Sequence, residues 1–457
     1  MSQPTVIEVR DAGQIEAVEH TLMVPENRED PDSRDIALRF VVLPAIEPSG
    51  QSPVVYLAGG PGGSATGTAQ SRRWPLFDAL RQDRDVILLD QRGTGRSYSP
   101  APCTSSVGWN EADIADRATF VQKQIAAFAE CEAFWLGEGD DLKGYTTEQS
   151  AADIAAVSEA LGQRVSLLGI SYGTHLALAT IKSHPEILDR AVLASVEGLD
   201  QTVKLPARTD AYLFRLEQAL NASLLAAGRE LYPDLGEALR IALRRIEQDR
   251  PAVDVYVARG QPPVKRTLGP FAVQLAIAFS LADPDRSHDV AQGILAMAAD
   301  EPDYSFMAFR GFLMPERIRM QAMPSIMDIA SGVSPDRMDL IEAQAQSALL
   351  GDATNFPMPH LLESGSAYLL PAEFRSDPEG DTPVLVISGT LDGRTYPESG
   401  LEATRLLPNR SVLTVENGGH NLFFHHPKVV PAILAFLDAG QLEQTRLVAA
   451  LPAAPER

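Results

Sequence analysis

The sequence predicts an α/β protein: a mostly parallel central sheet flanked by helices, with a helical cap domain inserted into it. Short, nearly continuous apolar segments alternate with helical patterns up to about residue 199 and again from 376 to 440. Parallel strands have this pattern because helices cover both faces of their sheet. Between these parts, residues 200–375 carry helical patterns and no strong strand signal. We therefore expect a core of residues 1–199 and 376–440, a cap at 200–375, and a C-terminal tail at 441–457.

The first part of the core contains five expected strands and two expected helices. The strands are Ile36–Ile46, Pro53–Ala58, Asp85–Asp90, Val165–Ile170 and Arg190–Val196. The helices are Thr146–Leu161 and Tyr172–Ser183. Thr146 and Gln149 have the spacing of a capping box, which marks the start of the first helix.

The insertion and the second part of the core follow in order. In the insertion, helices are expected at Thr209–Leu225 and Leu235–Ile246, and proline-broken segments lie between helical stretches. The core resumes with strands at Pro383–Ser388 and Ser411–Val415 and with helices at Glu398–Leu407 and Pro427–Leu437. Pro427 is expected in the first turn of the last helix. The tail is expected to be poorly ordered.

Composition disfavours several classes of function. The 457 residues, 45% of them hydrophobic, allow one large domain with an insertion, or two or three domains. The net charge of −22 disfavours nucleic acid and membrane surfaces as partners, because both carry negative charge. The N-terminal residues lack the basic and apolar regions of a signal peptide, so a cytoplasmic location is expected. The oligomeric state stays open.

The two cysteines, Cys103 and Cys131, are too few and too widely spaced for a zinc site or a disulfide framework. They could form one bridge in an oxidising compartment, but two independent thiols are the simpler interpretation for a cytosolic protein. No metal-ligand spacing occurs in the sequence, and we expect no cofactor.

Gly169-Ile170-Ser171-Tyr172-Gly173 fits the pattern G-x-S-x-G and lies between an expected strand and an expected helix. In that context the serine stands on a sharp, strained turn at the C-terminal edge of a sheet. With glycine near 7% of residues, chance alone gives on the order of one such pentapeptide per ten chains of this length. A chance match between a strand and a helix is rarer still, so Ser171 is the predicted nucleophile.

A serine hydroxyl needs a general base, and the partners of such a serine follow it in the order Asp or Glu, then His. Asp392 follows a buried strand in a glycine-rich turn, and His420 follows the next strand. Loops at one sheet edge can converge, so Ser171, Asp392 and His420 form a predicted catalytic triad. The alternatives are an ordinary turn aspartate and an ordinary loop histidine.

Three other histidines compete for the role of the base. His425 and His426 come just before Pro427, and we interpret them as the approach to the last helix. His175 lies inside the helix after Ser171, where packing is the favoured role.

An acyl-transfer enzyme must also stabilise a negative oxygen, usually with two backbone N–H groups. The glycine-rich turn at 59–63 follows an expected strand, so we expect the N–H groups of Gly60 and Tyr172 to form this oxyanion hole. Pro61 has no N–H to contribute. Asp90 and Arg92, after another strand, are predicted to pair with each other and brace this loop, with substrate binding by Arg92 as the alternative.

These segments resemble a known family. Gly59–Gly63, Asp90–Ser97, Gly169–Thr174, Tyr145–Thr147 and His184-Pro185 are similar to segments of the prolyl iminopeptidase and tripeptidyl-aminopeptidase-like serine hydrolases, members of the α/β-hydrolase superfamily. The resemblance covers roughly residues 17–200 and 380–440. It implies an α/β-hydrolase fold, a cap over the active site, and release of N-terminal residues from short peptides.

The sequence departs from this family beside the predicted site. Ala58 precedes Gly59 where many prolyl iminopeptidases carry histidine, and Ala194–Gly198 replaces the Asp-Gly-Val of many tripeptidyl-type relatives. The first expectation is therefore an aminopeptidase acting on short peptides, and the alternative is a carboxylesterase or lactonase for small apolar esters. A non-catalytic binding protein would typically lack a triad member, and dehalogenases and epoxide hydrolases require aspartate in place of Ser171.

An aminopeptidase must balance the positive charge of its substrate's amine with a carboxylate. Glu197 directly follows the strand Arg190–Val196 and should therefore lie at the sheet edge beside Ser171. It is the candidate for this role, although an ordinary solvated glutamate is an equally good interpretation.

Overall fold

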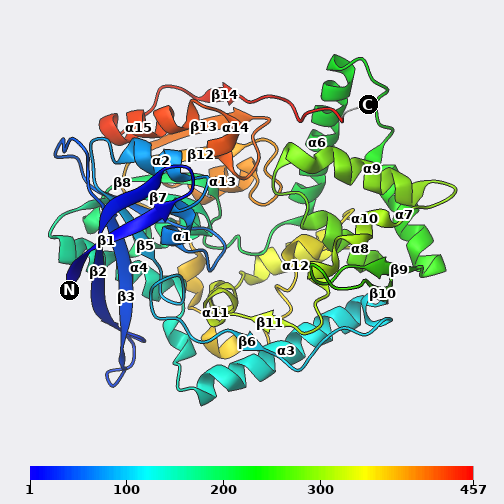
Figure 1. Ribbon diagram of the computed structural model, residues 1–457, viewed down its shortest axis with the longest axis horizontal. Coiled ribbons are helices and arrows are strands. Elements are labelled where there is room, and N and C mark those ends of the chain that lie inside the picture. Colours follow the sequence, from blue (N-terminus) through cyan, green and yellow to red (C-terminus); the bar gives the residue numbers. More distant parts are fainter. Residues whose placement is uncertain (456–457) are drawn as a thin grey trace.

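A computed structural model describes residues 1–455 of the protein, which are arranged around a central sheet. The strands follow the order β1-β2-β3-β5-β4-β7-β8-β12-β13-β14 (Figure 1). Their bounds are β1 Ser2–Val9, β2 Gly13–Pro25, β3 Asp35–Leu43, β4 Val54–Leu57, β5 Val86–Asp90, β7 Val165–Ser171, β8 Leu188–Val196, β12 Val384–Gly389, β13 Arg410–Glu416 and β14 Arg446–Val448. From β5 to β14 every neighbouring pair is parallel. The predicted α/β class with a mostly parallel sheet is confirmed.

Helices cover both faces of this sheet, as the continuous apolar strands predicted. On one face lie α4 (Thr147–Leu161), α5 (Tyr172–Ser183) and α13 (Pro397–Ala403), and on the other α1 (Ala65–Ala69), α2 (Trp74–Leu80) and α15 (Val429–Ala439). In β4, Leu57 packs with the first group and Tyr56 with the second. Half of the predicted capping box of α4 forms: the Thr146 hydroxyl accepts a hydrogen bond from the Gln149 backbone N–H, whereas the Gln149 side-chain oxygen accepts from Arg28.

Two local expectations are wrong, and two strands were not predicted. The antiparallel strands β1 and β2 escaped prediction, because in β1 only Ile7 and Val9 are buried and the strand carries little apolar signal. Helix α15 begins at Val429, so Pro427 precedes the helix instead of lying in its first turn. The tail contains β14, paired with β13, and its Pro452 carbonyl accepts a hydrogen bond from the Ser223 hydroxyl, so the expectation of a poorly ordered tail fails for residues 446–452.

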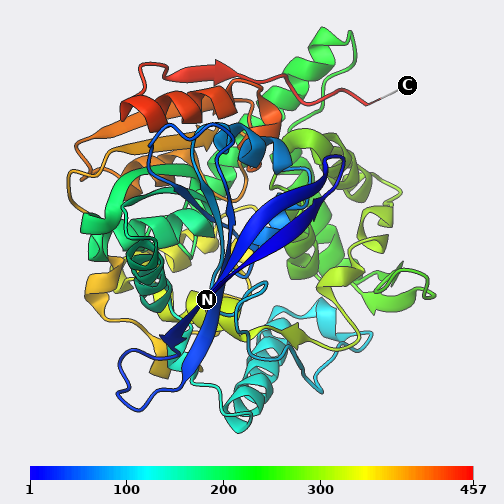
Figure 2. The ribbon, with the colours of Figure 1, turned by 60° about the vertical axis from the view of Figure 1, so that its left-hand side comes forward.

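The insertion is largely helical but not free of strands. Its helices of nine or more residues are α6 (Pro206–Ala226), α7 (Leu235–Asp249), α8 (Pro270–Ala278), α9 (Ser287–Ala298), α11 (Ala322–Ser331) and α12 (Pro335–Ala345). Strands β9 (Ala252–Val255) and β10 (Val264–Thr267) form a hairpin, which the sequence pattern did not predict. Figure 1 shows α6 to α9 on the side opposite the N-terminal strands, and in Figure 2 the dark blue β1–β2 pair crosses the front of the molecule with these green elements to its right.

A segment of the first core part joins the insertion. Strand β6 (Cys103–Thr104) pairs with β11 (Arg319–Met320), and helix α3 (Arg117–Gly137) lies along the same layer (Figure 1). Cys103 and Cys131 form a disulfide that fastens β6 to α3. The interpretation of two independent thiols is therefore wrong. A disulfide is typical of proteins from oxidising compartments and weighs against the expected cytoplasmic location. Within residues 1–455, no helix has both the length and the apolar character to cross a membrane.

Candidate active site

Ser171 lies at the junction of β7 and α5 in a strained backbone conformation. Its φ of 54° and ψ of −127° fall in a region that residues other than glycine rarely adopt. The flanking glycines are required by close packing: a Cβ at Gly169 would come within 2.4 Å of the Gly173 carbonyl oxygen, and one at Gly173 within 2.1 Å of that of Leu57. The two glycines thus allow β7, α5 and β4 to approach so closely that Ser171 is held at the sheet edge.

Asp392 and His420 are brought together at the same edge. His420 Nδ1 lies 2.9 Å from Asp392 Oδ2, and the Asp392 carboxylate also accepts hydrogen bonds from the N–H groups of Arg394 and Thr395 and from the Thr395 hydroxyl. Burial alone would raise the pKa of Asp392, but His420 and these donors hold it below its ordinary value. The carboxylate is therefore ionised at neutral pH and can orient the imidazole.

The rival histidines have other partners. His175 is buried, with Nδ1 3.0 Å from the Gly198 carbonyl oxygen and Nε2 3.0 Å from the Ser331 hydroxyl. His426 Nδ1 accepts the Lys428 N–H just before α15. Both positions agree with the packing and helix-approach roles that the sequence suggested.

The insertion contacts the loop that carries His420. The His420 N–H donates to the Ala282 carbonyl, and the Asp283 carboxylate accepts hydrogen bonds from the backbone and side chain of Asn421 and lies 3.1 Å from His425 Nε2. Despite burial, the His425 and Asn421 contacts lower the pKa of Asp283 to about 2. Asp283 is thus an ionised residue of the insertion that positions the histidine loop.

Asp283→Ala should lower kcat by about 10- to 100-fold, because misplacing a catalytic group by roughly 1 Å can cost 10²-fold. KM for a small ester should change little, since Asp283 does not line the cavity described below. Steady-state kinetics with 4-nitrophenyl butyrate would measure both. Asp289→Ala is the matched control, because Asp289 is an exposed acid of the same insertion. Equal kcat in the two variants would contradict the positioning role.

The glycine-rich loop at 59–63 lies directly against Ser171. A Cβ on Gly59 would come 3.0 Å from Ser171 Cβ and 2.8 Å from the Ile170 carbonyl oxygen. Gly60 has a φ of 132°, which favours glycine. The loop carrying Gly60 and the first residue of α5, Tyr172, therefore flank the serine, as an oxyanion hole would require.

Asp90 and Arg92 stabilise this region separately. The Asp90 carboxylate accepts hydrogen bonds from Ser64 and Thr66, which directly follow the glycine loop. Arg92 is fully buried and pairs with Asp153 of α4. The predicted Asp90–Arg92 pair is wrong, because each side chain has another partner, but the bracing of the loop by Asp90 and the structural role of Arg92 are confirmed.

One cavity of about 520 Å³ lies at this edge of the sheet. Its lining includes Gly60, Ser171 and His420 from the core and Lys204 and Ala282 from the insertion. The sheet edge that carries Ser171 is thus the edge on which this part of the insertion lies. A cavity of this size fits a small molecule or a short peptide.

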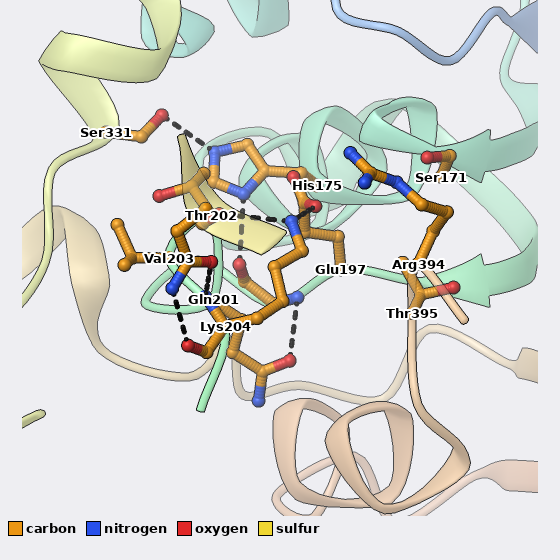
Figure 3. Close-up of polar contacts among 12 residues, drawn as sticks. Ser171, His175, Glu197, Gln201, Thr202, Val203, Lys204, Ser331, Arg394 and Thr395 are labelled. Carbon is orange, nitrogen blue, oxygen red and sulfur yellow. Dashed lines mark hydrogen bonds and ion pairs between the residues drawn. The ribbon is translucent and has the colours of Figure 1, made fainter. Parts of the chain in front are cut away.

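Glu197 also lines the cavity, but its charge is already balanced. It is only 7% exposed and forms an ion pair with Lys204 (Figure 3). Burial would raise the pKa of Glu197, but Lys204 lowers it below its ordinary value. Nearby Asp328 on α11 has a pKa raised to about 7 by burial and by the charge of Glu197. The structure therefore brings Glu197 to the cavity, and it adds two residues that the sequence did not suggest.

Lys204, Asp283, Asp328 and Arg394 were all missed. Three of them come from the insertion, and only its packing on the core brings them to the site. The sequence could have indicated Arg394 as a residue of the site, because it lies two positions after Asp392 in the same turn.

Comparisons with known proteins place these features in a family. Residues 52–427 match the family described as alpha/beta hydrolase fold. Tripeptidyl aminopeptidase of Streptomyces coelicolor is 30% identical over 157 residues, which cover 32% of this chain and 28% of that protein. Proline iminopeptidase of Xylella fastidiosa is 31% identical over 145 residues, which cover 32% of each protein. A solved epoxide hydrolase from an endophytic Streptomyces has a TM-score of 0.41 and 16% identity, and covers 94% of this chain and 99% of its own.

The chain spans about a third or less of the length of these curated relatives. The family match, in contrast, runs from before β4 to after His420 and includes Ser171 and Asp392. The chain therefore belongs to the α/β-hydrolase fold family.

Proposed function

We propose that the protein is a serine hydrolase that acts through an acyl-enzyme, with Ser171 as nucleophile, His420 as general base and Asp392 as the group that orients His420. The observation that carries this proposal is that a strained Ser171 and the Asp392–His420 pair meet at one cavity. Ser171 Oγ attacks the substrate carbonyl while His420 accepts its proton. The N–H groups of Gly60 and Tyr172 receive the developing negative oxygen. His420 then protonates the leaving group, and water releases the acyl group by the same steps.

The preferred substrates in this proposal are short peptides with a free N-terminus. The similarity to tripeptidyl aminopeptidase and proline iminopeptidase supports this choice. The carboxyl groups of Glu197 and Asp328 near the cavity support it too, because an ammonium group in a partly dry site needs a negative partner.

A carboxylesterase or lactonase is the second candidate, favoured by one observation. Lys204 already balances Glu197, so that carboxylate is not free to receive an amine. Comparing hydrolysis of alanyl- and prolyl-4-nitroanilide with 4-nitrophenyl butyrate separates the candidates. Turnover of the ester alone would exclude the aminopeptidase, and turnover of neither would contradict the serine hydrolase itself.

In the aminopeptidase proposal the substrate amine shares the Glu197 carboxylate with Lys204, so Glu197→Gln should raise KM for substrates with a free amine by about 10-fold, the effect of removing one charged hydrogen-bond partner. Neutral esters should be nearly unaffected, since they bring no charge to be balanced. Equal losses on both substrate types would indicate a structural role, and no loss on either would remove Glu197 from the site.

The wild-type KM for amine substrates should also fall as pH rises through about 7. Asp328 becomes ionised in that range and adds negative charge near Glu197, until the substrate amine itself loses its proton near pH 8. Asp328→Asn should abolish this fall in KM, while the KM for a neutral ester stays flat with pH in both proteins. A fall that persists in Asp328→Asn would show that another group causes it.

A further inference from the structure

Arg394 places an unpaired guanidinium at the active-site cavity. Its side chain lines the cavity, and its Nη1 atom is buried without a hydrogen-bond partner. Within residues 1–455, the Arg394 guanidinium has no ion pair; it lies 5.7 Å from the centre of the Phe279 ring. Figure 3 shows the side chain extending between Ser171 and the Glu197–Lys204 pair. A buried N–H without an acceptor is costly, and a bound acceptor would remove that cost.

Other arginines near this sheet edge are already engaged. The Arg73 guanidinium donates to the Tyr56 hydroxyl and contacts the Asn421 side chain, and Arg92 is paired with Asp153. These two side chains hold parts of the protein together. The charge of Arg394 lowers the pKa values of Glu197 and Asp328 through space, but in the described chain its guanidinium makes no ion pair with either carboxyl group. Its N–H groups can therefore donate to a ligand.

The lining of the cavity is positive although the whole protein is strongly negative. Arg72, Arg73, Lys204 and Arg394 line it, and Glu197, which pairs with Lys204, is the carboxylate among the lining residues. Asp328 lies near Glu197, but its pKa of about 7 leaves it only partly ionised at neutral pH. The chain as a whole carries a net charge of −22. Such a local excess of positive charge attracts and retains anions.

We propose that the cavity binds a carboxylate group of the substrate on Arg394. The planar guanidinium presents two parallel N–H groups that match the two oxygens of a carboxylate. The proposal rests on Ser171 being the nucleophile of a hydrolase, but it does not depend on whether the scissile bond is an amide or an ester. The substrate class is thus a short peptide with a free carboxylate, or an ester that carries a carboxylate elsewhere in the molecule.

The carboxylate could belong to the acyl group or to the leaving group, and matched ester pairs distinguish these sources. For the acyl side, the 4-nitrophenyl monoester of adipate is compared with 4-nitrophenyl hexanoate. For the leaving side, the acetyl ester of 4-hydroxybenzoate is compared with that of 4-hydroxybenzamide. In each pair the two members differ mainly in one negative charge.

We expect the wild-type protein to prefer the anionic member of one pair, and Arg394→Gln to raise KM for that member by about 10- to 100-fold. KM and kcat for the neutral member should stay near wild type, which also shows that the variant is folded and that the Asp392–His420 pair is intact. Arg394→Lys should recover part of the loss, because it restores the charge without the planar fork. Arg72→Gln is the comparison variant: Arg72 lines the same cavity and adds to its positive charge, but it is exposed and stacks on Phe424, so solvent screening should make its loss on the anionic member clearly smaller.

The proposal would be overturned by no preference for the anionic member in either pair, or by equal losses on anionic and neutral members in Arg394→Gln. A loss in Arg72→Gln as large as that in Arg394→Gln would also overturn it, since the effect would then come from general charge. Trialanine and its C-terminal amide test the aminopeptidase separately. If neither is cleaved while the ester results hold, the carboxylate site stands and the peptide substrate is rejected.

Discussion

Ser171→Ala is expected to lower kcat by about 10⁵- to 10⁶-fold, the range typical for removal of a serine nucleophile. The substitution removes a single oxygen, and the backbone around it is held by the close contacts of Gly169 and Gly173. The fold should therefore survive, with a thermal unfolding midpoint within a few degrees of wild type. Steady-state kinetics and a thermal melt measure the two quantities.

A serine-directed fluorophosphonate gives an independent readout of the same residue. It should add one label to the wild-type protein and none to Ser171→Ala, and peptide mapping should place the label at Ser171. Ser195 is a useful control, because it also has a positive φ, 56°, at the end of the neighbouring strand β8. Its hydroxyl donates to the His420 carbonyl, so Ser195→Ala should keep the label. Labelling of any other residue, or activity near wild type in Ser171→Ala, would refute the assignment of the nucleophile.

The core could be predicted from sequence because its strands are buried on both faces. Segments such as Val86–Asp90 and Val384–Gly389 are buried at every position, so their apolar pattern has no interruption. The β1–β2 pair could not be predicted in the same way, since its edge strand is mostly exposed and polar. The disulfide also escaped prediction, because a sequence separation of 28 positions says nothing of the distance between Cys103 and Cys131 in space.

The residues of the candidate site also fall into those that could be predicted from the sequence and those that could not. Ser171 ends the buried strand β7 and Asp392 follows the buried strand β12, while His420 follows β13, in which only Leu413 and Val415 are buried. All three strands were predicted, and that was enough to bring the three residues to one edge. Lys204, Asp283 and Asp328 reach the site only because the insertion packs on the core. No periodic pattern in the sequence indicates that packing. Asp90 and Arg92 show the limit of local reasoning: residues two positions apart face different partners, α1 and α4.

His420→Ala should lower kcat nearly as much as Ser171→Ala, because members of a triad act as a unit. Without the imidazole, the serine hydroxyl has no general base, and the Asp392 carboxylate loses the group that it orients. The expected loss is again about 10⁵- to 10⁶-fold in kcat, with little change in KM for a small ester. Double substitution of Ser171 and His420 should cost hardly more than either single change, which distinguishes a shared step from two independent contributions.

His425→Ala is the matched control for the choice of base, since His425 lies five residues away and is also paired with an aspartate. That aspartate is Asp283, which belongs to the insertion and holds Asn421 as well, so the loop keeps two of its three contacts when His425 is lost. The expected loss in kcat is therefore about 10-fold or less, as for a side chain that positions a loop. If His425→Ala were as damaging as His420→Ala and abolished fluorophosphonate labelling, His425 and Asp283 would replace His420 and Asp392 in the catalytic assignment.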